Sequence, residues 1–107
     1  MPKYLLQFTY NDDALAELIT HPQDRGKVVS ELFDRLGGKV ESFYHSLGEY
    51  DLVTIAEFPD NETMAAITNA VRAAGVEKDH KITILLTREE ALMALKRAGS
   101  TGYQPPS

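Results

Sequence analysis

Apolar and polar residues alternate at strand spacing, or recur at helical spacing, along most of the chain. Residues 3–10 mix aromatic and aliphatic side chains with a few polar ones and lead into the turn residues 11–13, which predicts a strand followed by a helix start. Asp12 is expected to cap a short helix. That helix should end near Thr20, because the residue before Pro22 avoids the α region.

A second helix is expected from residue 23 to the pair at residues 37–38, two glycines that end it. Its inward stripe is predicted from apolar residues spaced three and four apart, namely Val28, Val29, Leu32, Phe33 and Leu36. Residues 39–47 and 50–58 then predict two strands joined by a turn of two or three residues around Gly48. These two strands form a hairpin.

The second half of the chain predicts helix, strand and helix. Asp60 is expected to cap a helix that ends at Gly75 and whose Met64, Ile67, Val71 and Ala74 share one face. Residues 80–86 are β-branched and leucine-rich, which indicates a strand. Thr87 and Glu90 match a capping box for a last helix.

This order, β-α-β-β-α-β with an extra C-terminal helix, predicts a ferredoxin-like α+β fold with a four-stranded antiparallel sheet. Residues 1–98 are expected to form one domain, since about 100 residues suit a single core. Residues 99–107 are small, polar and proline-rich, so we expect a flexible tail.

Strands 3–10 and 50–58 both carry apolar residues in each of their two alternating sets. A sheet with one face in water should instead alternate apolar with polar residues. We therefore expect a second copy to cover the face without helices, sheet against sheet. The predicted assembly is a homodimer, or a higher homo-oligomer, in which two sheets form a dimeric α+β barrel.

Composition narrows the functional classes. The chain has no cysteine, which excludes disulfides, thiolate nucleophiles and cysteine-bound metals. Its net charge of −5 disfavours nucleic acid and anionic lipid as partners. The start of the chain lacks the plan of a secretory signal and no apolar run approaches a membrane span, so we expect a cytoplasmic protein.

The hairpin segment GEYDLV, with LGGKVESFY before it, IAEFPDNET after it and PKYLLQFTY at the start, resembles the GYD-domain family over about residues 2–98. The motif residues are Gly48, Tyr50 and Asp51. The resemblance implies a small protein of the dimeric α+β barrel group, with no activity established for the family. That wider group includes monooxygenases of aromatic substrates, muconolactone-type isomerases, haem-handling proteins and ligand-sensing modules.

The hairpin also offers a candidate catalytic pair. A three-residue turn would place His45 opposite Asp51, Phe43 opposite Val53 and Lys39 opposite Glu57, whereas a two-residue turn would shift each partner by one. In the first register Asp51 would orient the imidazole of His45, which could then act as a base near neutral pH.

The same residues have a structural interpretation, which we favour. Gly48 permits a positive φ in a tight turn, Tyr50 is a good strand former, and Asp51 can accept backbone N–H groups. Either interpretation leaves His45 as an even choice between a structural and a functional histidine.

A ligand pocket is expected between the sheet and the partner subunit. Gln7, Thr9, Ser42 and Thr54 are short polar residues within apolar strands, a pattern that suits either a pocket or strand positions touching water. With the hairpin tyrosines, the predicted ligand-binding residues are Gln7, Tyr44, Tyr50 and Thr54.

We expect no metal and no cofactor. His21 is expected in an exposed loop and His80 is expected to be solvated or paired locally, and the three histidines show no metal-ligand spacing. Residues 37–38 follow a helix, whereas a phosphate-binding loop precedes one.

Three functions remain open at this point. The first, which demands least of the residues, is a module that binds a small, possibly aromatic, molecule. The second is a monooxygenase- or isomerase-like enzyme with His45 and Asp51 as its acid–base pair. The third is a purely structural oligomerisation module.

Overall fold

The computed structural model describes residues 1–107 as four strands and four helices. In chain order these are β1 (Lys3–Tyr10), α1 (Asp12–Thr20), α2 (Arg25–Arg35), β2 (Lys39–His45), β3 (Leu52–Glu57), α3 (Asn61–Ala73), β4 (Glu77–Leu85) and α4 (Arg88–Ala98). All eight predicted elements are present in the predicted order. Residues 99–107 form no helix or strand and are exposed.

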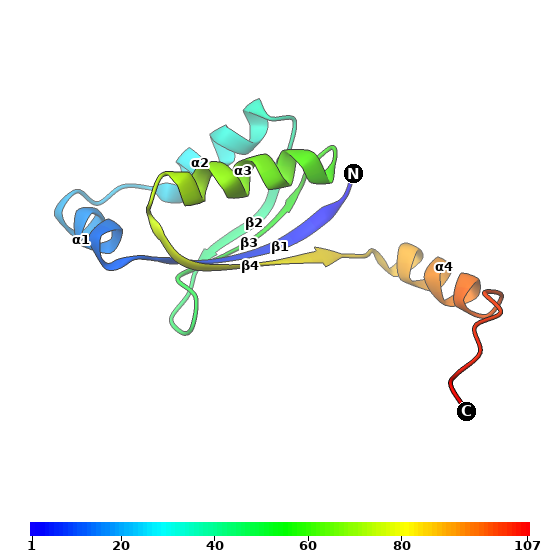
Figure 1. Cartoon of the computed structure of the whole chain (residues 1–107). Coiled ribbons are helices and arrows are strands. Elements are labelled where there is room, and N and C mark those ends of the chain that lie inside the picture. The colour runs from blue at the N-terminus through cyan, green and yellow to red at the C-terminus, as the bar shows by residue number, and fades with distance from the viewer.

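The strands form one antiparallel sheet in the order β2-β3-β1-β4. This order, with the connections α1–α2 and α3, confirms the predicted α+β fold of ferredoxin-like topology. Helices α2 and α3 lie side by side over one face of the sheet, and the loop between β2 and β3 projects from the opposite side (Figure 1).

Most of the predicted helix ends are confirmed. The Thr87–Glu90 capping box is present, Asp60 caps α3, and Gly37 and Gly75 follow α2 and α3 with φ of 79° and 72°. The cap of α1 was wrong by one residue, because Asn11 rather than Asp12 accepts the backbone N–H of Ala14. Asparagine caps as well as aspartate, so local preference does not separate the two.

The predicted register of the hairpin was wrong near its loop. His45 pairs with Leu52 rather than with Asp51, which is the register expected of a two-residue turn. Lys39 does pair with Glu57 as predicted, because an irregularity between Val40 and Ser42 shifts the register by one residue. The loop is also longer than predicted. It spans residues 46–51, and the N–H of Ser46 donates to the carbonyl of Asp51 across its base at 2.8 Å.

Asp51 is hydrogen-bonded to β1 as well as to Ser46. Its N–H donates to the carbonyl of Phe8 at 2.8 Å, and its Oδ2 accepts the N–H of Tyr10 at 3.0 Å. Asp51 thus lies opposite Ser46 rather than His45, and its two hydrogen bonds to β1 fix it in this register, in which His45 pairs with Leu52.

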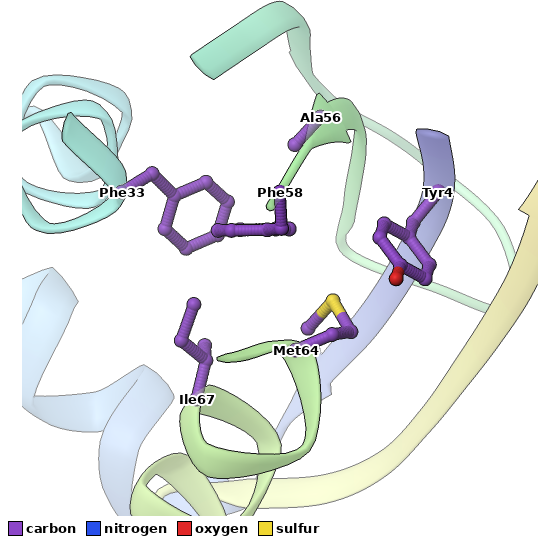
Figure 2. Packing of buried hydrophobic residues seen from close by; sticks show 6 residues of the cluster. All are labelled: Tyr4, Phe33, Ala56, Phe58, Met64 and Ile67. Atoms are coloured by element: carbon purple, nitrogen blue, oxygen red, sulfur yellow. The ribbon is translucent and has the colours of Figure 1, made fainter. Parts of the chain in front are cut away.

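The buried core is small and lies beneath one part of the helical layer. Only eight of the 107 residues are buried, and six of these form one cluster: Tyr4, Phe33, Ala56, Phe58, Met64 and Ile67. Figure 2 shows Phe33 of α2 and Met64 and Ile67 of α3 around Phe58. The ring of Phe58 lies 4.8 Å from that of Phe33, edge to face, which is a favourable aromatic geometry.

Gly38 allows the chain to pass this core. A Cβ at residue 38 would lie 2.6 Å from Cδ1 of Phe58 and 2.7 Å from the carbonyl oxygen of Glu57. A glycine is needed here for close packing, in addition to the left-handed φ at Gly37.

The face without helices is mixed in character. Leu5, Val53 and Ile55 lie together on it, because the register pairs Leu5 with Ile55 and Gln7 with Val53. Lys3 on the same face lies 3.1 Å from a carboxylate oxygen of Glu41. The sequence led us to expect a more uniformly apolar surface, so the apolar strip is narrower than predicted.

Helix α4 projects away from the rest of the molecule, beyond the end of β4 (Figure 1). The molecule measures 58 × 34 × 24 Å with a radius of gyration of 17.3 Å, whereas a compact chain of this length has about 13 Å. Leu92 and Leu95 of α4 are 54% and 71% exposed. None of the helices is both long and apolar enough to cross a membrane.

The cap of α3 predicts a pH dependence of stability. Hydrogen bonds from the hydroxyl and N–H of Thr63 hold the pKa of Asp60 below its ordinary value. A lowered folded-state pKa means that the contribution is complete above the unfolded-state pKa and is lost as the pH falls through the folded-state pKa.

We therefore expect Asp60→Ala to destabilise the protein more at about pH 7 than at about pH 3, by urea unfolding at each pH. Asp34→Ala, which removes an exposed carboxylate from α2, is the control and should show no such change. An equal effect of Asp60→Ala at both pH values would contradict the charged cap.

Candidate functional site

A large cavity lies between the sheet and helices α2 and α3, with a volume of about 600 Å³. This size is within the usual range for pockets that bind small molecules. Its walls are mostly hydrophobic. They are built from β1 and β3 (Leu6, Phe8, Leu52), α2 (Val28, Val29, Leu32, Phe33), β2 (Phe43), α3 (Met64, Ile67, Val71) and β4 (Ile82).

The two threonine hydroxyls within these walls are engaged with the backbone. Oγ1 of Thr54 donates to the carbonyl of Ser42 at 2.6 Å, and Oγ1 of Thr68 donates to the carbonyl of Met64 at 2.9 Å. These two hydrogen bonds satisfy the buried donors locally. The middle of the cavity therefore offers an apolar surface to a ligand.

Polar side chains that line the cavity gather where β1 ends and where α2 and β4 begin. The register pairs Tyr10 with Glu77 and Phe8 with His80, which puts these residues on the face covered by helices, and Arg25 is the first residue of α2. We call Tyr10, Arg25, Glu77 and His80 the polar end of the cavity.

Within the polar end, Glu77 and His80 form a pair. Nδ1 of His80 lies 2.7 Å from Oε1 of Glu77, whose side chain is only 11% exposed, and Nε of Arg72 lies 4.0 Å from the same oxygen. A carboxylate at Nδ1 fixes the orientation of the ring and leaves Nε2 as the second site for a proton. Such a pair has the chemistry of a general base.

Tyr10 is the second titratable group of the polar end. Desolvation raises the pKa of its hydroxyl, and the nearby positive charge of Arg25 opposes that rise. The hydroxyl is therefore protonated at neutral pH and can act as a hydrogen-bond donor. The ring of Phe8 packs against that of Tyr10 edge to face, with centroids 5.0 Å apart.

The predicted catalytic pair does not lie at this site. His45 is exposed, pairs in the ladder with Leu52, and packs its ring edge to face against Phe43 at 5.6 Å. The carboxylate of Asp51 accepts the N–H of Tyr10 instead of orienting His45. The side-by-side geometry on which the acid–base hypothesis depended was wrong.

The predicted ligand-binding residues are on different sides of the sheet. Thr54 faces the helices, where it is buried, while Tyr44 is 69% exposed and lies on the other face beside Val53. Gln7 and Tyr50 both border a second, more polar hollow of about 360 Å³ under the β2–β3 loop. Gln7 also lines the large cavity together with Thr54, whereas Tyr44 and Tyr50 do not.

The other histidines differ in their surroundings. His21 is exposed and its Nδ1 lies 3.0 Å from Glu17, one helical turn earlier. His80 is paired locally, as predicted, but it also lines the cavity, which the sequence did not indicate. No group of three or more His, Cys, Asp or Glu side chains is placed to hold a metal ion.

Fold and cavity together define a small ferredoxin-like α+β domain with a partly open, largely apolar cavity on the side of its helices. The sequence pattern of the GYD domain matches residues 4–95, so the chain belongs to the GYD domain family. A protein of Thermus thermophilus named "Glutamine synthetase and cystathionine beta-lyase binding protein" is 34% identical over 65 residues, which are 61% of this chain and 68% of that relative.

The different surroundings of Asp51 and His45 predict different effects of their removal. We expect Asp51→Ala to lower the free energy of unfolding by about 1–2 kcal/mol, because the N–H of Tyr10 loses its acceptor. His45→Ala, an exposed change, should stay within about 0.5 kcal/mol. Chemical denaturation measures both, and a larger loss for His45→Ala would contradict this assignment.

Proposed function

We propose that the protein is a small-molecule-binding module of the cytoplasm that works as a homodimer, and that its ligand occupies the cavity between the sheet and helices α2 and α3. The cavity is the observation that supports this function. A largely apolar chamber with a few convergent polar groups is the common form of a binding site for a small organic molecule. The proposed ligand site is thus on the helix side of the sheet, and not at the interface between the sheet and a partner subunit where the sequence predicted it.

The dimer is proposed from the other face of the sheet. Leu5, Val53 and Ile55 form an apolar strip there that no helix of the chain covers (Figure 1). The exposed ring of Tyr44 widens this strip toward β2. Two copies related by a two-fold axis would bury the strip against itself, since a two-fold interface uses the same patch twice.

The enzyme alternative finds less support than the binding module. Its predicted residues, His45 and Asp51, do not lie side by side. The group with the chemistry of a general base is His80 with Glu77, which belongs to the same cavity that the binding module uses.

Filling the cavity tests the binding function. We expect Ala70→Trp, on the α3 side of the cavity, to weaken the binding of naphthalene carboxamide, a neutral aromatic probe, at least about tenfold by titration calorimetry, because the indole would occupy the space of the ligand. Ala65→Trp is the matched control, since Ala65 is on the same helix, is exposed and does not line the cavity. Equal weakening by both variants, or none by either, would count against the cavity as the site.

Charge on the apolar strip tests the dimer. We expect the protein to be a dimer by light scattering at micromolar concentration, and Val53→Glu to weaken the dimer at least about tenfold, because it would bring like charges together in an apolar interface. Ala65→Glu, on the outer side of α3, should leave the dimer intact. A monomeric wild-type protein would refute the proposed assembly.

A second candidate function is the binding of another enzyme. The Thermus relative is named for binding glutamine synthetase and cystathionine beta-lyase. The feature of this chain that suits such a partner is α4, which projects from the domain and exposes an apolar stripe containing Leu92 and Leu95, three residues apart on one side of the helix.

We expect purified glutamine synthetase to bind the wild-type protein, and the double change Leu92→Glu with Leu95→Glu to weaken that binding at least about tenfold, because it would place charges in the apolar contact. Met93→Glu is the matched control, because Met93 is equally exposed but lies on a different side of α4. Surface plasmon resonance measures both. Undiminished binding by the double variant would exclude α4 as the docking element.

A further inference from the structure

We propose that the ligand of the cavity is an apolar monocarboxylic acid, whose carboxylate binds the guanidinium of Arg25 and the hydroxyl of Tyr10 while its apolar body lies between α2, α3 and the sheet. This inference rests on the proposed binding function and names the class of ligand. It is carried by one cation without an ion-pair partner in the lining of an apolar cavity.

Arg25 is a partly buried cation that forms no ion pair in the structure. Its hydrogen bond runs from Nη1 to Oε1 of the exposed Gln23 at 3.0 Å. A guanidinium carries five N–H donors, and besides Gln23 the hydroxyl oxygen of Tyr10 lies within reach of them, so some donors remain for a ligand. Partly buried charges are normally paired, and the planar donor fork of arginine matches the two oxygens of a carboxylate.

The acidic groups near Arg25 already accept hydrogen bonds elsewhere. The carboxylate of Glu77 is held by His80 at 2.7 Å and approached by Arg72, that of Asp51 accepts the N–H of Tyr10, and that of Asp24 accepts the N–H of Lys27 as the cap of α2. Each of these carboxylates is therefore engaged without Arg25. Arg25 is therefore left without an ion-pair partner in the protein.

One further feature of the polar end favours a negative charge. The hydroxyl of Tyr10 is protonated at neutral pH and lies near Arg25, so it can donate to a carboxylate oxygen.

The rest of the cavity fits the apolar part of such a molecule. Of the 24 residues that line it, 18 are hydrophobic, and they include the aromatic rings of Phe8, Phe33 and Phe43. These rings suit an aromatic body, because aromatic side chains contribute a large contact area and favourable edge-to-face geometry.

A matched pair of ligands tests the inference. Naphthoic acid and naphthalene carboxamide have nearly the same shape, but only the acid is charged at neutral pH. We expect the wild-type protein to bind the acid at least about tenfold more tightly than the amide by titration calorimetry, because a charge-assisted bidentate contact is stronger than a neutral one. Arg25→Gln should reduce this preference to about threefold or less, mainly by weakening the binding of the acid.

Arg35→Gln is the control for this change, because Arg35 is the exposed last residue of the same helix. It should keep the full preference for the acid. Tyr10→Phe removes only the hydroxyl and should lower the affinity for the acid severalfold, and more than that for the amide, because a hydrogen bond to a charged acceptor is the stronger one. Circular dichroism of each variant confirms that the fold is kept.

The outcomes separate this inference from the binding function. Equal binding of acid and amide by the wild-type protein would overturn the carboxylate preference while leaving the cavity as a binding site. A preference that survives Arg25→Gln would overturn the assignment of Arg25. Absence of binding by both ligands would overturn the inference and the binding function together.

Discussion

The cluster of side chains around Phe58 holds the helical layer on the sheet, and the remaining features depend on it. Phe33 joins α2 to this cluster, and Met64 and Ile67 join α3 (Figure 2). Six of the eight buried residues belong to this cluster, while the same two helices also cover the polar end of the cavity, where Tyr10 and His80 lie. The domain is therefore packed tightly in one part and hollow in another. A packed anchor beside an open chamber allows a small domain to keep its fold and still admit a ligand.

The sequence was sufficient for the elements, because each helix and strand carries its own signal. The apolar periodicity around Leu32, the glycines after α2 and the capping box at Thr87 are all local features, and the structure confirms them. The register at the hairpin loop was not available from local pattern. It depends on hydrogen bonds between Asp51 and β1, a strand some forty residues earlier, and on the irregularity after Val40.

The candidate site was missed for a related reason. Tyr10, Arg25 and the Glu77–His80 pair come from the end of one strand and the starts of a helix and another strand, and no spacing in the sequence links them. Only the predicted fold could have indicated that these residues meet, because β1 and β4 are neighbours in a ferredoxin-like sheet and the end of β1 lies beside the start of β4. Alternation of apolar residues suggested a pocket on the other face. That face instead carries a narrower apolar strip with charged neighbours such as Lys3.

Three surfaces of the chain thus have separate proposed roles: the cavity for a ligand, the sheet face without helices for a second copy, and α4 for another protein. The central claim is that the ligand enters on the helix side of the sheet. Methyl NMR of the protein titrated with naphthoic acid tests this claim most directly. The account predicts shifts for the methyl groups of Val29, Val71 and Ile82, which line the cavity, and shifts confined to Leu5, Val53 and Ile55 on the opposite face would contradict it.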